Sequence, residues 1–61
     1  MNKSNDGYIV EFYHVGNSVK VTAVDPASGT EASVIVPTTL PSEQASVQAI
    51  RKLEFVLNKK S

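Results

Sequence analysis

Residues 8–36 read YIVEFYHVGNSVKVTAVDPASGTEASVIV, and this stretch decides the fold. It contains three runs rich in β-branched and aromatic residues, separated by two turn signals. The first signal is Gly16-Asn17, a pair typical of two-residue hairpin loops. The second is the segment 25–29, in which a turn-starting Asp, a Pro that presets φ and a Gly that accepts positive φ follow one another. We therefore expect strands over residues 8–15, 19–24 and 30–36.

The two turns predict the same buried sheet face. A two-residue loop pairs Val15 with Ser18, and a four-residue loop pairs Asp25 with Thr30. Side chains alternate between faces along a strand, and directly paired residues share a face. Both registers then place one apolar set on a common face: Tyr8, Val10, Phe12, Val19, Val21, Ala23, Ala32, Val34 and Val36.

A helix is predicted after the third strand. Pro37 ends that strand, and Pro41, Ser42 as a capping residue and Glu43 in the first turn mark a helix start. We expect the helix to run to about Lys59, with its apolar stripe formed by Ser46, Ala49, Ile50, Leu53, Val56 and Leu57. The predicted fold is α+β, a three-stranded antiparallel meander followed by one C-terminal helix packed on one sheet face. Residues 7–60 form a single domain in this interpretation, and residues 1–6 form a disordered tail.

The length of the chain predicts a small core. A domain of 61 residues buries only about 60% of the surface of its unfolded chain, and such cores are commonly supplemented by disulfides, a metal or a second subunit. The sequence has no cysteine and a single histidine, His14, so we expect neither a disulfide nor a structural metal. A second subunit is the remaining source of stability.

Charge and hydropathy argue against two classes of partner. Six Lys and Arg residues balance six Asp and Glu residues, whereas nucleic-acid-binding domains usually carry a basic excess. No run approaches the roughly 20 apolar residues of a membrane span, and residues 1–7 lack the apolar segment of a signal peptide. We expect a cytoplasmic protein that does not enter membranes.

One helix covers only one face of a sheet, so apolar residues elsewhere are candidates for an interface. We predict a protein-interaction surface, most simply the interface of a two-fold homodimer, on the opposite sheet face or on the helix side away from the stripe. Its candidate residues are Ile9, Tyr13, Val24, Ile35, Val47 and Phe55.

The sequence offers little chemistry. His14 is the only side chain that ordinarily titrates near neutral pH, and we interpret it as structural. No phosphate loop, paired carboxylates or metal-ligand cluster is recognisable, so we predict no enzymatic activity and no cofactor. An alternative function, nucleic-acid binding by an accessory domain, would use a basic strip on the helix, which Glu43 and Glu54 dilute. The strip, a candidate weak anion or nucleic-acid surface, consists of Arg51, Lys52, Lys59 and Lys60.

Three segments carry a resemblance to a known family. They are residues 15–21, VGNSVKV, residues 25–31, DPASGTE, and residues 51–57, RKLEFVL. Together they resemble a family of very short alphaproteobacterial proteins of unknown function. The resemblance implies the same fold and a bacterial cytosolic setting, but it implies no site residues.

Overall fold

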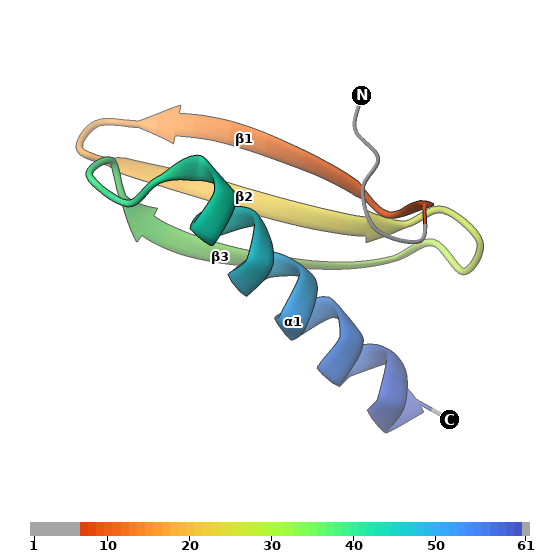
Figure 1. The fold of residues 1–61 in the computed structure, drawn as a ribbon. Helices are drawn as coiled ribbons and strands as arrows, with labels where there is room; N and C mark the ends of the chain where they lie inside the picture. Colours follow the sequence, from red (N-terminus) through yellow and green to blue (C-terminus); the bar gives the residue numbers. More distant parts are fainter. Residues whose placement is uncertain (1–6, 61) are drawn as a thin grey trace.

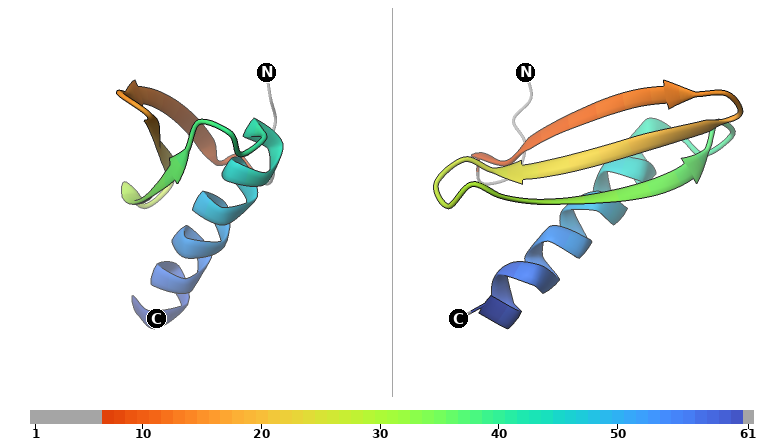
Figure 2. Two further views of the ribbon diagram at one scale, coloured as in Figure 1. Left: turned by 90° about the vertical axis from the view of Figure 1, so that its left-hand side faces the viewer. Right: turned by 180° about the vertical axis from the view of Figure 1, so that it is seen from behind.

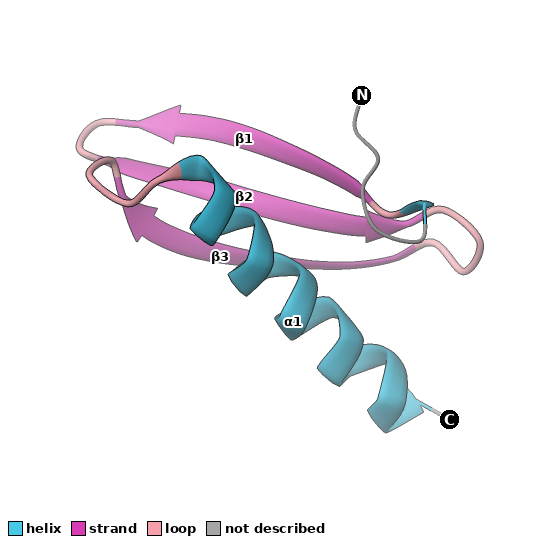
Figure 3. Cartoon of the chain, viewed as in Figure 1, coloured by secondary structure: helices cyan, strands magenta, loops and turns pink. Residues whose placement is uncertain are grey.

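The computed structural model, which describes residues 7–60, is a three-stranded antiparallel sheet with one helix on one face (Figures 1 and 3). The sheet has the order β1-β2-β3, so β1 and β3 are its two edges. The predicted α+β fold is confirmed, whereas the predicted disordered tail, residues 1–6, lies outside the described residues. The elements are β1 (Ile9–Val15), β2 (Ser18–Asp25), β3 (Thr30–Pro37) and α1 (Ser42–Lys60).

Both predicted registers are confirmed. Val15 pairs with Ser18 across the first hairpin, and Asp25 pairs with Thr30 across the second. Gly16 has a φ of 60°, the left-handed conformation that a primed hairpin turn requires at its first central position. In the second turn the Asp25 carboxylate accepts hydrogen bonds from the Ala27 N–H at 3.2 Å and the Ser28 hydroxyl at 3.0 Å. Asp25 therefore stabilises the turn, as its sequence context predicts.

The core between sheet and helix is made of small side chains. Half of its buried members in the described chain are alanines, and the largest fully buried side chains are Leu53 and Val21. Full burial of a Val or Leu contributes about 1.5–3 kcal/mol, and an alanine contributes less. The core is therefore thin, and it consists of Val19, Val21, Ala23, Ala32, Val36, Ala45, Ala49 and Leu53.

The helix crosses the sheet diagonally, over β2 and β3 rather than over β1 (Figure 2). Its C-terminal part extends beyond β3 (Figures 1 and 2). Ala49 and Leu53 of the predicted stripe are buried, and Ile50 and Leu57 pack against the core, while Ala45, which the predicted stripe omits, is buried as well. The sequence pattern gave the angular position of each residue but not the point at which the helix leaves the sheet.

The helix start also differs from the prediction. The Ala45 N–H donates to the Pro41 carbonyl at 3.0 Å, so the helical hydrogen bonding begins at Pro41. Ser42 is then the first helical residue rather than the cap, and its carbonyl accepts a bond from the Ser46 hydroxyl at 3.0 Å. Within residues 7–60, no helix combines the length and the apolar character that a membrane crossing needs.

Candidate interaction surface

β1 is the least buried strand of the sheet. Phe12 points to the helix side of the sheet, as predicted, yet 41% of its surface is exposed. On the other face Tyr13 is 69% exposed and Val15 is 58% exposed. The cause is the position of α1, which lies over the other two strands. β1 thus carries exposed apolar side chains on both faces of the sheet, because α1 covers little of this strand.

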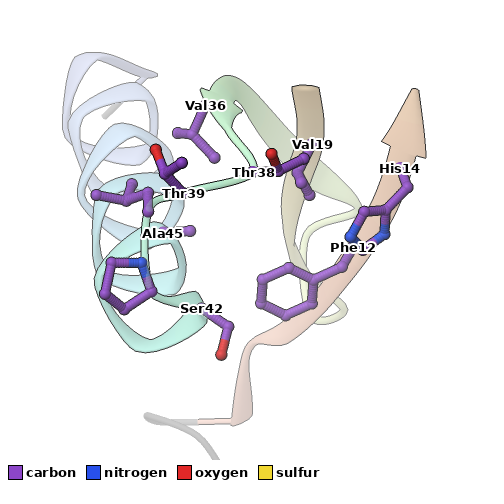
Figure 4. A pocket seen from close by; sticks show the side chains of 10 residues that line it. Phe12, His14, Val19, Val36, Thr38, Thr39, Ser42 and Ala45 are labelled. Carbon is purple, nitrogen blue, oxygen red and sulfur yellow. The ribbon is translucent and has the colours of Figure 1, made fainter. Parts of the chain in front are cut away.

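A cleft of about 340 Å³ lies between β1 and the start of the helix. Figure 4 shows Phe12 and His14 along one wall, with Thr39 and Ser42 across from them. Val19 and other core residues form its floor, so the cleft is a continuation of the core toward solvent. Its polar groups are hydroxyls and the His14 imidazole, which is exposed.

The outward edge of β1 is identified by the register. The pair that closes a two-residue hairpin is hydrogen-bonded, and hydrogen-bonded pairs recur at every second residue of an antiparallel ladder. Counting from the closing pair Val15–Ser18, the peptide groups of Glu11 and Tyr13 bond to β2. The peptide groups that point away from the sheet belong to Val10, Phe12 and His14, and we call them the β1 edge.

The opposite edge of the sheet, on β3, is protected against pairing with another strand. Lys52 of α1 extends its ammonium to the Ser33 carbonyl and donates a hydrogen bond of 2.8 Å. Pro37 ends the strand and has no N–H to offer. The helix passes over this strand (Figure 2). Lysine, proline and a covering helix are the usual means by which proteins keep a sheet edge from pairing with another chain.

The predicted interaction residues fall on two opposite surfaces. Ile9, Tyr13 and Ile35 lie on the sheet face away from the helix and are 49%, 69% and 66% exposed, and Val24 there is half-buried. The middle of this face is polar, and there the Thr22 and Ser33 hydroxyls share a hydrogen bond of 2.8 Å.

Val47 and Phe55 lie on the other surface, because α1 presents them away from the sheet. They are 48% and 62% exposed, and Val47 lies among Glu43, Gln48 and Arg51. One flat partner cannot touch both this helix surface and the outer sheet face. The sheet face and the helix surface therefore remain two separate candidate interfaces, as the sequence predicts.

The basic strip is partly engaged within the chain. Lys52 is bonded to Ser33, and the Lys59 ammonium lies 5.5 Å from the centroid of the Phe55 ring, a cation–π distance. Arg51 is exposed, and the side chain of Lys60 lies outside what the structure describes. Two of the four cations thus have partners within the chain, so fewer of the predicted strip residues are available to bind an anion.

Sequence reasoning missed the β1 edge. It assigned Phe12 to the core and left Val15 and the backbone of β1 out of the interface. The signal was present in the sequence, since β1 reads IVEFYHV and contains neither Lys nor Pro, and Glu11 is its one charged edge-protecting residue. What the sequence did not show is that the helix lies away from this strand.

An open meander with one helix, a core rich in alanine and an unprotected apolar edge strand define a small α+β protein. No curated protein and no solved structure shows significant similarity to the chain. Residues 5–60 match the model of a family described as domain of unknown function (DUF6898), and the chain belongs to that family. The resemblance to an uncharacterised family is thereby confirmed, while the bacterial source it implies stays a prediction.

Proposed function

We propose that the chain is a non-enzymatic protein-interaction module of the cytoplasm that self-associates. The observation that carries the proposal is β1, an edge strand whose apolar side chains are exposed on both faces of the sheet. Exposed, unprotected edge strands are templates for pairing with another chain. The thin core adds a thermodynamic reason, because burial of Phe12, Tyr13 and Val15 in an interface adds the apolar contacts that a core this small lacks.

The size of the particle in solution tests this proposal. Sedimentation equilibrium and light scattering, from low micromolar to millimolar concentration, are expected to show mass rising from that of one chain to that of two. A single-chain mass over the whole range would overturn self-association. Added salt is expected to leave the dimer largely intact, because apolar contacts and backbone hydrogen bonds are little screened.

Nucleic-acid binding through the basic strip is the alternative that the sequence raised. Among the described residues no feature favours it over self-association, since Lys52 and Lys59 are engaged within the chain. We therefore expect flat titrations with duplex DNA, single-stranded DNA and RNA at low salt. Binding that weakens steeply as salt is added would identify the basic strip as a phosphate-contacting surface instead.

A further inference from the structure

We propose that two copies of the chain join through the β1 edge, antiparallel about a two-fold axis at Phe12, to form one continuous six-stranded sheet. This inference rests on the self-association proposed above and adds the surface and the register. A two-fold axis makes the interface self-complementary, so the same seven residues of β1 serve both copies.

The contrast between the two edges selects β1. On β3 the Ser33 carbonyl already accepts a hydrogen bond from Lys52, and Pro37 closes the strand. On β1 the N–H and C=O groups of alternate residues point outward, and among residues 7–60 no helix or strand lies beside them (Figure 2). A second strand can form hydrogen bonds with all of these groups at once. Only the β1 edge leaves its groups available for such pairing.

The residues of β1 select the register. Phe12 is the midpoint of Ile9–Val15, so an axis at Phe12 pairs all seven residues of the strand and every other axis pairs fewer. An axis at Glu11 would set two carboxylates directly opposite each other, which is destabilising. An axis at Tyr13 would carry Ile9 past the end of the partner strand.

Pairing about Phe12 gives the exposed Ile9, Glu11, Phe12, Tyr13 and Val15 side chains compatible neighbours. On the outer face Glu11 lies opposite the partner's Tyr13, a carboxylate beside a phenol that can donate to it. Ile9 lies opposite the partner's Val15, an apolar pair at each end. On the helix side the two Phe12 rings meet at the axis, where an aromatic pair is favourable.

The helices do not obstruct this arrangement. A two-fold axis perpendicular to the sheet places both helices on the same face. Each helix lies over β2 and β3, so about four strand spacings, roughly 19 Å, separate the two. This distance exceeds the 8–10 Å of packed helices, and both copies of β1 stay accessible to each other.

Amide hydrogen exchange of the unaltered protein tests the paired edge. In a monomer the N–H groups of Val10, Phe12 and His14 face solvent, whereas those of Glu11 and Tyr13 are bonded to β2 and serve as internal controls. At concentrations where the dimer exceeds the monomer about tenfold, the exchange rates of the three edge amides are expected to be at least about tenfold lower than in dilute samples. The reason is that exchange proceeds through the free monomer.

Disulfide trapping tests the register. In the proposed dimer Glu11 and the partner's Tyr13 form a non-hydrogen-bonded pair with Cα atoms about 4.5 Å apart, within the roughly 4.4–6.8 Å range of disulfides. The chain has no cysteine of its own, and both residues are exposed, so each can be replaced without loss of the core. Mixing Glu11→Cys with Tyr13→Cys is expected to give the mixed disulfide dimer under mild oxidation.

Each single variant is the matched control, because a residue and its own copy lie on a diagonal of about 7–8 Å. Cross-linking of the mixture well above that of either variant alone supports the register. A dimeric mass with fast exchange at the three edge amides, or equal cross-linking in all samples, would overturn the β1 pairing and leave self-association standing. A single-chain mass at every concentration would overturn both.

Discussion

Leu53 is the side chain on which the packing of the helix depends. It is fully buried and is one of the two largest fully buried side chains, in a core otherwise formed by Val and Ala. Leu53→Ala is expected to lower the free energy of unfolding by about 2–5 kcal/mol, comparable with the whole stability of a domain of this size. Urea denaturation followed by circular dichroism measures the loss.

Val47→Ala is the control for that substitution, because Val47 lies on the same helix but is half exposed. Its effect is expected to stay within about 0.5 kcal/mol. Because Ala is the best helix former, neither substitution loses stability through helix propensity, and equal losses for the two variants would contradict the role of Leu53 burial.

Gly16 supplies the backbone conformation of the first hairpin. Its φ is 60°, and a Cβ added there would meet no atom within 4 Å, so any cost of substitution comes from the backbone alone. Gly16→Ala is expected to destabilise the domain by about 1–2 kcal/mol. Gly16→Asn should cost less, because Asn tolerates this conformation, and equal urea midpoints for the two variants would contradict this account.

At the residue scale the sequence predicted which face each side chain takes but not how far each is covered. Phe12 was assigned correctly to the helix side, because alternation and turn length determine the face. Its exposure depends on where α1 lies, which is a tertiary property. Ala45 was missed for a different reason, since a small side chain gives a weak periodic signal even when it is buried.

At the scale of the strand, the hydrogen-bonding direction of β1 allows a selective disruption. The His14 N–H points outward, so His14→Pro removes a donor of the proposed interface without removing a bond to β2, and edge strands tolerate such prolines. We expect this variant to remain folded and to have the mass of one chain under conditions where the parent is dimeric. Sedimentation equilibrium measures the difference.

His14→Ala is the control for the proline, because it removes the same imidazole but keeps the N–H. It is expected to stay dimeric, and so is Phe55→Asp, which changes only the outward side of α1. Loss of the dimer in Phe55→Asp with retention in His14→Pro would locate the interface on the helix.

At the other edge, Lys52 couples the helix to β3. Lys52→Met removes the donor to the Ser33 carbonyl and the charge that discourages a further strand. With one of the three protections of the β3 edge removed, this variant is expected to form some assemblies larger than a dimer, seen as a rising scattering mass at high concentration. Arg51→Met, which removes a neighbouring exposed charge, should not do so.

At the scale of the whole molecule, the topology could be predicted because it depends on local signals. Two turns with defined residue types determined the pairing, and a single apolar sheet face required the helix to pack on it. The interface could not be predicted in the same way. The six candidate residues were selected by side-chain polarity, which divides them between opposite surfaces, whereas the backbone edge of β1 appears only once the position of the helix is known.

The stability of the whole molecule should depend on its concentration if β1 completes the fold between two chains. Dimer formation stabilises the folded state by mass action, as a bound ligand does, so the melting temperature of the parent is expected to rise by several degrees between low micromolar and millimolar samples. His14→Pro should melt at one temperature throughout, near that of the dilute parent. Differential scanning calorimetry over this range provides the measurement. A parent whose melting temperature is independent of concentration would show that the thin core is sufficient for one chain alone.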